Sequence, residues 1–221
     1  MRRAREYIEK GLSLLFPQNL YCICCGNIID DSRTYSLCDY CMDHIRWNAD
    51  DPYERGDMLF MKCMEYGPLE RSIIFDLKYN RKRYFARNIA EIMRDRFEIS
   101  GLSADLIIPV PMNKSKQRMR GFNQAALIGR HMSKIMGIEC IEDALVRTRN
   151  TRPMRGLGPE ERAENIAGSI DFNEFYGTIA KGKTVLLIDD FYTTGSTAQE
   201  CRRALSKSEP KNIIFLAFAA R

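Results

Sequence analysis

One stretch decides the fold class: Thr184-Val-Leu-Leu-Ile-Asp-Asp-Phe-Tyr-Thr-Thr-Gly-Ser-Thr197. Within it, Val185 to Ile188 is a short apolar run bounded by polar residues, which is the pattern of a strand buried on both faces. Two adjacent carboxylates, Asp189 and Asp190, end this run, and a polar loop leads into a segment with a helical pattern, Ala198 to Ser206. The stretch therefore predicts a buried strand, a pair of acids, a loop and a helix, in that order.

The polar loop after the acids has the composition of a phosphate site. It consists of Thr193, Thr194, Gly195, Ser196 and Thr197, and it precedes a helix N-terminus, where free N–H groups and the helix dipole stabilise an anion. The loop lacks the lysine of a Walker A motif, and its single glycine does not match the dinucleotide-binding pattern. A buried strand followed by an ordinary capped helix is the alternative, but adjacent carboxylates are costly to bury without partners. The whole stretch resembles the phosphoribosyl pyrophosphate (PRPP) motif of type I phosphoribosyltransferases.

The overall composition is that of a globular protein with anionic partners. The chain has 221 residues, enough for one core domain and a small module, and a formal net charge of +5. Between Lys114 and Arg155, ten lysines and arginines are accompanied by only three acids. This concentration favours an anionic ligand or a nucleic acid, and a solvated basic face is the alternative.

Outward from the central stretch, apolar runs alternate with segments of helical periodicity. Strands are predicted at Leu59 to Tyr66, Asp105 to Pro111, Ala144 to Arg149 and Asn212 to Ala219, with a short edge element at Ile170 to Phe172. Helices are predicted at Leu69 to Lys78, Phe85 to Phe97 and Gln124 to Met136. Strands separated by helices predict an α/β fold with a parallel sheet and a ligand at the carboxyl ends of the strands. This phosphoribosyltransferase-like domain is expected to cover residues 51–221.

A second basic segment follows the strand at Asp105 to Pro111. We expect residues 112–124 to form a loop that carries Lys114, Lys116, Arg118 and Arg120 beside the N-terminus of the next helix. Arginine forks suit a pyrophosphate group, so this loop is a candidate pyrophosphate clamp. A solvated basic loop is the alternative.

Two C-x2-C pairs near the N-terminus predict a metal site. Cys22, Cys25, Cys38 and Cys41 can form a tetrahedral four-thiolate site, which is the structural type for zinc, and Gly26 suits the tight turn of such a knuckle. Cys24 can replace Cys22 as a ligand, although C-x2-C is the better spacing. Disulfide bonds and a redox C-x-x-C motif fit less well, because the chain has the character of a cytoplasmic protein and no βαβ pattern surrounds the pairs.

The first fifty residues are expected to form a separate small module. Ile8 to Phe16 reads as an amphipathic helix that stops at Pro17, and the cysteine pairs follow it. This segment lacks a signal-peptide cleavage site, and no segment approaches the length of a membrane span. We therefore predict a cytoplasmic protein with a module at residues 1–50.

Taken together, these motifs resemble the ComF-type family of competence-associated, phosphoribosyltransferase-like proteins, including its GntX-like members. The resemblance covers nearly the whole chain. It rests on the cysteine pairs, the PRPP motif and the following blocks: Leu15-Phe-Pro17, Tyr66-Gly-Pro-Leu69, Leu77-Lys-Tyr79, Pro109-Val-Pro111, Arg120-Gly-Phe-Asn-Gln124, Arg147-Thr-Arg-Asn-Thr151 and Arg162-Ala-Glu-Asn165.

The resemblance implies roles for the residues of the site. Asp189 and Asp190 would hold the ribose hydroxyls of PRPP with the help of Mg²⁺, and Thr193 to Thr197 would hold its 5′-phosphate. The segment from Arg120 to Asn123 would face the pyrophosphate, and Arg118 of the same basic loop is a further candidate for this group. The implied function is PRPP binding combined with single-stranded DNA handling during natural transformation, together with competence machinery proteins.

An active phosphoribosyltransferase in nucleotide salvage is the alternative function. Such an enzyme needs a group that manages the protons of the base. The only histidines are His44, in the cysteine module, and His131, in the middle of a predicted helix, so the sequence identifies no catalytic residue.

Overall fold

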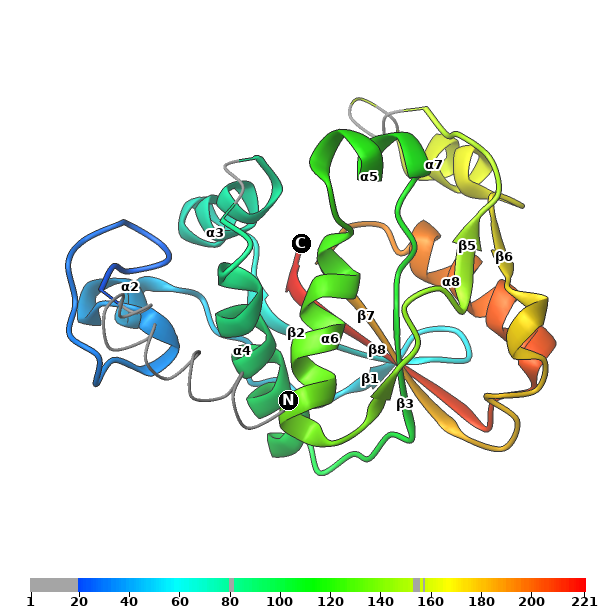
Figure 1. Cartoon of the computed structure of the whole chain (residues 1–221), viewed down its shortest axis with the longest axis horizontal. Helices are drawn as coiled ribbons and strands as arrows, with labels where there is room; N and C mark the ends of the chain where they lie inside the picture. The colour runs from blue at the N-terminus through cyan, green and yellow to red at the C-terminus, as the bar shows by residue number, and fades with distance from the viewer. Residues whose placement is uncertain (1–19, 80–81, 153–155, 157) are drawn as a thin grey trace, which may run out of the picture.

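The computed structural model describes residues 20–79, 82–152, 156 and 158–221, so the predicted N-terminal helix lies outside the described residues. A six-stranded sheet forms the centre of the protein, in the order β1-β2-β8-β7-β3-β4 (Figure 1). Its strands are β1 (Tyr53–Glu54), β2 (Leu59–Glu65), β3 (Leu106–Pro109), β4 (Glu139–Cys140), β7 (Thr184–Tyr192) and β8 (Asn212–Ala220). All neighbours are parallel except β1 and β2, which pair antiparallel.

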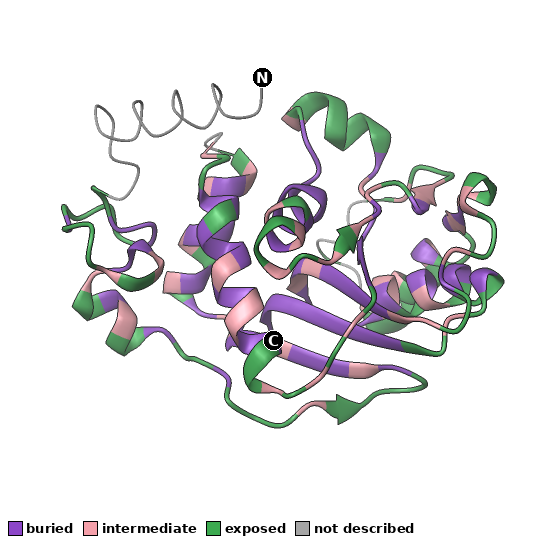
Figure 2. Ribbon diagram, turned by 60° about the horizontal axis from the view of Figure 1, so that its bottom comes forward, coloured by how far each residue is buried: buried purple, intermediate pink, exposed green. Residues whose placement is uncertain are grey.

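The central strand β7 shows why the sheet is covered on both faces. Leu186 and Ile188 belong to one hydrophobic cluster, whereas Val185 and Leu187 belong to a second cluster. Because successive side chains of a strand point to opposite faces, an uninterrupted apolar run requires a layer on each side. The prediction of a strand buried on both faces is therefore confirmed, and most residues of β3, β7 and β8 are buried (Figure 2).

Two groups of helices supply these layers. On one face, the core is shared with α3 (Pro68–Tyr79), α4 (Phe85–Ile99) and α6 (Gln124–Met136). On the other face, it is shared with α7 (Pro159–Ile166), α8 (Ser196–Leu205) and a small antiparallel pair, β5 (Leu145–Arg147) with β6 (Ile170–Phe172). The predicted fold class, an α/β sheet that is mostly parallel and flanked by helices, is confirmed.

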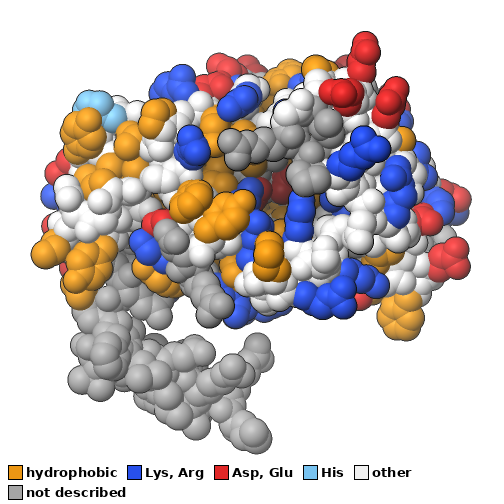
Figure 3. Space-filling model, turned by 90° about the horizontal axis from the view of Figure 1, so that it is seen from above, with side chains coloured by type: hydrophobic (Ala, Val, Ile, Leu, Met, Phe, Trp, Pro, Cys, Tyr) orange, Lys and Arg blue, Asp and Glu red, His pale blue; other side chains and the backbone are white. Residues whose placement is uncertain are grey.

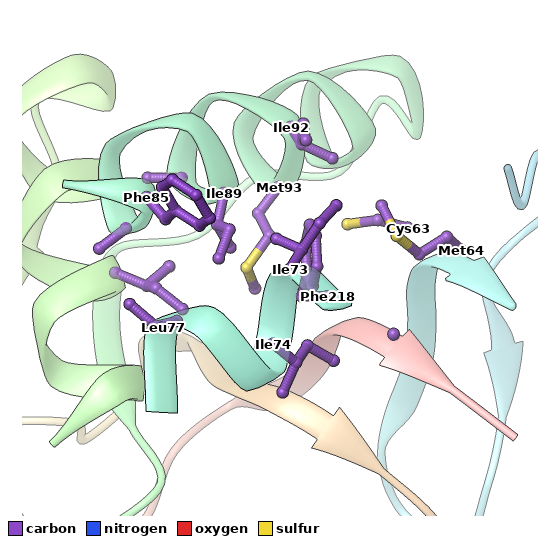
Figure 4. Packing of buried hydrophobic residues seen from close by; sticks show 14 of the residues in the cluster. Cys63, Met64, Ile73, Ile74, Leu77, Phe85, Ile89, Ile92, Met93 and Phe218 are labelled. Carbon is purple, nitrogen blue, oxygen red and sulfur yellow. The ribbon is translucent and has the colours of Figure 1, made fainter. Parts of the chain in front are cut away.

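The first of these layers is densely packed and apolar. Ile73 and Leu77 of α3 point toward Ile89 and Met93 of α4 over Phe218 of β8, and all five side chains are fully buried (Figure 4). Apolar residues at three- and four-residue spacing place one face of each helix on the sheet. Burying such side chains contributes roughly 1.5–3 kcal/mol each relative to exposure, so this layer firmly fixes the α3 terminus that carries Lys78.

The cysteine module joins the same core. It contains η1 (Thr34–Ser36) and α2 (Asp39–His44), and its Ile23, Leu37 and Ile45 are part of the cluster under α4. Tyr35 Oη donates a hydrogen bond of 2.6 Å to Asp95 Oδ2 of α4, and Asn88 Nδ2 donates one of 2.9 Å to Ser36 Oγ. Apolar and polar contacts therefore both tie the module to the sheet domain.

Three details differ from the sequence-based expectation. The strand β7 continues through the two acids to Tyr192, because its ladder with β8 continues past Asp189↔Ala217 to Tyr192↔Ala220. The expected loop at residues 114–120 is a helix, α5 (Lys114–Arg120), which the Asn113 side chain caps at its N-terminus and Gly121, at φ 85°, ends. The predicted strand at Ala144 to Arg149 is β5, which lies outside the main sheet.

Candidate ligand site and metal centre

Two adjoining cavities lie at the carboxyl ends of the parallel strands. The first, which we call the loop niche, is a space of about 40 Å³ lined by the loop that follows β7 and by Arg162 of α7. The second, the basic cavity, measures about 310 Å³ and lies between α3, α5 and the N-terminus of α6. Asp189 and Thr197 line both cavities, so the two are neighbouring parts of one site. Seen from above, basic side chains surround a hollow on this face (Figure 3).

Backbone geometry shapes the loop niche. Gly195 has φ 85° and occupies the N-cap position of α8, which has no side-chain cap hydrogen bond. A Cβ at this position would lie 3.0 Å from Cζ of Tyr192, so both the positive φ and the close approach require glycine. The niche is lined by Thr193, Thr194, Gly195, Ser196 and Thr197, as expected for a phosphate loop. The uncapped N–H groups at the start of α8 are available to an anion.

The hairpin between β1 and β2 supports this loop from outside. The Arg55 guanidinium lies 5.2 Å from the centroid of the Tyr192 ring and donates a hydrogen bond of 3.3 Å to the carbonyl oxygen of Thr194. In return, Gln199 Nε2 of α8 donates to the carbonyl oxygen of Arg55 at 3.5 Å. These contacts link the segment that follows the cysteine module to the loop niche.

The two carboxylates of the motif differ in their surroundings. Asp190 is 6% exposed, and its Oδ1 accepts a hydrogen bond of 2.9 Å from Lys78 Nζ of α3. Asp189 makes no ion pair with a described residue, and its Oδ1 accepts from the Asp190 backbone N–H at 2.8 Å. Burial, and after it the neighbouring Asp190 carboxylate, raises the pKa of Asp189 to about 7. Asp189 is therefore the carboxylate that remains available to a ligand.

Cationic side chains line the other side of the basic cavity. Three elements, α3, α5 and β5, contribute them: Lys78, Lys116, Arg120 and Arg147. Burial lowers the pKa of Lys116, and the charges of Arg147, Arg120 and Lys78 lower it further. Burial also lowers the pKa of Arg147, which nevertheless stays protonated. Like charges gathered beside two acids disfavour one another, and an anionic ligand relieves this repulsion.

The predicted pyrophosphate residues have three different placements. Arg120 lines the basic cavity, where its Nη1 donates to Gln124 Oε1 at 2.7 Å and its guanidinium lies 5.2 Å from the Tyr79 ring centroid. Asn123 also lines the cavity, but its Oδ1 accepts from Ala125 N and its Nδ2 donates to Val110 O, so it caps α6. Arg118 is exposed on α5 and is not among the residues that line the cavity.

Sequence reasoning did not single out several residues of the site. The cavities are lined by Lys78, Gln124, Arg147 and Arg162, for which the sequence patterns predict no individual role. All four occur within the motif blocks that carry the family resemblance, so their place in these blocks is the sequence feature that indicates a role in the site. Neither histidine lines either cavity: His44 stacks on Tyr40 in the cysteine module, and His131 belongs to α6.

The four predicted cysteine ligands come together. The sulfur atoms of Cys22, Cys25, Cys38 and Cys41 all lie within 4.8 Å of one another. A tetrahedral zinc–thiolate site with Zn–S bonds near 2.3 Å has sulfurs roughly 3.8 Å apart, so this group fits such an ion. The Gly26 N–H donates to Cys22 O at 2.9 Å with φ 77° at Gly26, which is the tight turn expected of the knuckle.

Cys24 is not part of this group. Its Sγ lies 3.6 Å from Leu69 O and 3.6 Å from Ser72 Oγ, so it points toward α3. Among the described residues, the group of four nearby sulfur atoms contains Cys22 and not Cys24, which favours Cys22 as the fourth ligand of the proposed site.

Comparison with known proteins identifies relatives of one kind. The chain is 30% identical over 144 residues to competence protein F of Haemophilus influenzae, which covers 61% of each chain. It is 26% identical over 149 residues to DNA utilization protein YhgH of Escherichia coli K12, covering 65% of this chain and 64% of that protein. It is 29% identical over 104 residues to competence protein ComFC of Bacillus subtilis, covering 45% and 38%. The matches span less than two thirds of these relatives.

The chain is thus similar to proteins named for competence and DNA utilization, which is the kind of relative that its motifs predict. No family model matches it. Among solved structures, it is similar to adenine phosphoribosyltransferase from Saccharomyces cerevisiae, with a TM-score of 0.43, 13% identity and coverage of 64% and 72%. It is also similar to adenine phosphoribosyltransferase from Leishmania tarentolae, with a TM-score of 0.42 and 16% identity, covering 87% of this chain and 90% of that protein. In the described part of the chain, no helix has the length and apolarity needed to cross a membrane.

Proposed function

We propose that this protein binds PRPP together with Mg²⁺ and acts in DNA uptake, where it handles single-stranded DNA. One observation carries the proposal: a loop niche and a basic cavity meet at Asp189. A pentose with a phosphate at one end and a pyrophosphate at the other needs three kinds of groups in this order. These are hydrogen-bond donors for the phosphate, carboxylates for the ribose hydroxyls and cations for the pyrophosphate. The names of the relatives, which refer to competence and DNA utilization, support the cellular role.

Each part of PRPP has a proposed partner. The 5′-phosphate occupies the loop niche and accepts hydrogen bonds from N–H groups and hydroxyls of Thr193 to Thr197. The ribose hydroxyls donate to the carboxylates of Asp189 and Asp190. The pyrophosphate lies in the basic cavity, where Arg120 and Lys116 donate charge-assisted hydrogen bonds. Asn123 acts by holding the start of α6 in place, since both polar ends of its side chain contact the backbone.

Magnesium fits this arrangement through one carboxylate. Asp190 is already paired with Lys78, whereas Asp189 has no ion-pair partner among the described residues. Mg²⁺ is usually held by one or two carboxylates together with substrate phosphates and water, so Asp189 is the proposed protein ligand. The bound ion would offset the charge that raises the pKa of Asp189.

A nucleic-acid strand would contact the basic surface beside the cavity. Lys114 and Arg118 are exposed on α5, and neither lines the cavity. Tyr79 is 59% exposed at the cavity mouth and offers a ring on which a base can stack. Charge beyond that needed for one pyrophosphate is the reason to propose a second, larger anionic partner.

Zinc is the proposed ion for the four-cysteine group. Four thiolates leave no open position for a substrate, so the role is structural. The proposed module at residues 1–50 is too small for a core of its own, and the ion would replace the missing core.

The experiment titrates one preparation with Mg²⁺–PRPP and with a short single-stranded oligonucleotide, separately and together, at several salt concentrations. Strand affinity is expected to fall with salt by about 0.7 log units of affinity per log unit of salt for every phosphate neutralised. Arg118→Gln should flatten this slope without changing PRPP affinity. Base-dependent release of pyrophosphate without strand binding would instead establish a salvage phosphoribosyltransferase. Neither histidine lines the cavities, so neither is placed to manage the protons of the base in such an enzyme.

A further inference from the structure

Three buried donor atoms around the site have no hydrogen-bond partner. They are Arg162 Nε, Gln124 Nε2 and Arg147 Nε, and all three residues line one of the two cavities. A buried donor without a partner costs about 1–3 kcal/mol, so such groups are rare in folded proteins. Their concentration at one site indicates that a ligand supplies the missing acceptors.

Arg162 is the unpartnered donor of the loop niche. It lies in the first turn of α7, on the wall of the niche that Thr193 to Thr197 do not form. Its guanidinium adds a full positive charge to a niche whose other anion-binding groups are the N–H groups and hydroxyls of Thr193 to Thr197, with the Asp189 carboxylate at the boundary to the basic cavity. That charge suits a terminal phosphate monoester, which carries close to two negative charges near neutral pH.

Gln124 is the corresponding donor of the basic cavity. Its side chain is 1% exposed, and its Oε1 accepts a hydrogen bond of 2.7 Å from Arg120 Nη1. Because the oxygen is engaged by a donor, the amide nitrogen is the free end of the side chain. Gln124 is also the first residue of α6, so its free N–H group adds to the positive end of that helix.

We infer that Arg162 and Gln124 are specificity-determining residues that recognise opposite ends of one ligand. Arg162 selects a phosphate monoester in the loop niche, and Gln124 selects a second anionic group in the basic cavity. Asp189, which lines both cavities, lies between them. The ligand class is a pentose phosphorylated at both ends. This inference rests on the proposed function and assigns that selectivity to two side chains.

The test crosses two variants with three ligands. Calorimetry with Mg²⁺ measures the affinities of ribose 5-phosphate, pyrophosphate and PRPP for each protein. Arg162→Gln is expected to lower the affinity for ribose 5-phosphate and for PRPP about tenfold or more and to leave the affinity for pyrophosphate unchanged. Gln124→Met is expected to lower the affinity for pyrophosphate and for PRPP by roughly tenfold and to leave the affinity for ribose 5-phosphate unchanged.

Further variants separate binding from folding. Gln124→Glu keeps the acceptor for Arg120 but replaces the free donor by an anionic oxygen, so pyrophosphate affinity should fall further than in Gln124→Met. Arg87→Gln removes an exposed arginine of α4 that pairs with Glu91, and it should change no affinity. For each variant, the ligand that still binds shows that the site is folded.

The outcomes distinguish the inference from the proposed function. Equal losses for all three ligands in both variants, or no loss in either, would overturn the assignment of the two ends while PRPP binding stands. Failure of the unaltered protein to bind PRPP or ribose 5-phosphate would overturn the proposed function and the inference together.

Discussion

The cysteine module and the ligand site reach their geometry in opposite ways. In the module, four ligands come from two short segments, and their sulfur atoms lie within 4.8 Å of one another. In the site, α3, α5, α6, α7 and the strand β7 each contribute side chains that are distant in the sequence. The proposed zinc site of the module rests on local cysteine spacing, whereas the ligand site depends on a sheet that brings distant residues together.

The two regions also differ in which groups are left without a partner. In the module, the four cysteine sulfur atoms lie close enough together to share one cation, for which zinc is the proposed ion. In the site, Lys78 compensates Asp190, but Asp189 keeps a raised pKa and several donors lack partners. Functional sites commonly retain such unfavourable features because the ligand relieves them.

The largest expected effect is loss of metal from the module. Cys38→Ser, or a strong chelator, should release one zinc per chain and unfold the module, because the free energy of structural zinc binding is on the order of 10 kcal/mol. Elemental analysis and thermal unfolding measure this effect. Cys24→Ala is the matched control, since Cys24 points toward α3, and it should retain the zinc. Zinc retained by Cys38→Ser would contradict the assignment.

The next effect concerns the ion pair under the site. Lys78→Met leaves the Asp190 carboxylate buried without its partner and should cost about 3 kcal/mol of unfolding free energy. The double variant Lys78→Met/Asp190→Asn should lose less than the sum of the single losses, with a coupling of about 2 kcal/mol. Urea denaturation of the four proteins measures this cycle. Additive losses would show that the pair does not stabilise the site.

At Asp189 we expect a smaller effect, in which a substitution increases the unfolding free energy instead of lowering it. Its pKa of about 7 in the folded protein exceeds the unfolded value of 3.8, so its contribution to stability is present below pH 4 and lost as the pH rises through 7. Asp189→Asn cannot ionise, and it should therefore match the parent at pH 4 and exceed its stability by about 2 kcal/mol at pH 8. Thermal unfolding without Mg²⁺ across this range is the measurement. A variant that is equally stable at both pH values would exclude the raised pKa.

The smallest effect tests whether Asn123 is a cap or a ligand contact. Asn123→Ala removes the hydrogen bond to Ala125 N and should cost about 1 kcal/mol, whereas Asn123→Ser should restore most of that stability. Denaturation midpoints report the cap. If Asn123→Ala keeps full stability but loses PRPP affinity, the side chain contacts the ligand and the structural role is wrong.

The two regions also differ in how far the sequence predicts them. The spacing of the cysteine pairs predicts the four sulfur atoms that the structure brings together, whereas the separation of Cys24 from this group is visible only in three dimensions. The motif around Asp189 likewise predicted strand, acids, loop and helix, because each of these is a local pattern.

Other features of the site depended on long-range packing. Lys78 lies opposite Asp190 only because α3 packs over β8, and nothing near either residue in the sequence indicates that pairing. The sequence predicts a loop where the structure has helix α5, because a basic segment of seven residues lacks an apolar face and its helical signal is the cap at Asn113. The strand β5 lies outside the main sheet and pairs antiparallel with β6, and no local pattern in the sequence indicates this pairing.

The central claim is that Mg²⁺–PRPP binds where the loop niche meets the basic cavity. The most direct measurement is calorimetry at pH 8 with the parent protein, Asp189→Asn and, as a matched control, Asp171→Asn, whose exposed carboxylate pairs with Lys207. The parent and Asp171→Asn should bind one PRPP per chain only when Mg²⁺ is present. Asp189→Asn should stay folded and lose at least about a hundredfold in affinity, because one Mg²⁺ ligand is gone. Equal affinity in all three proteins would contradict the claim.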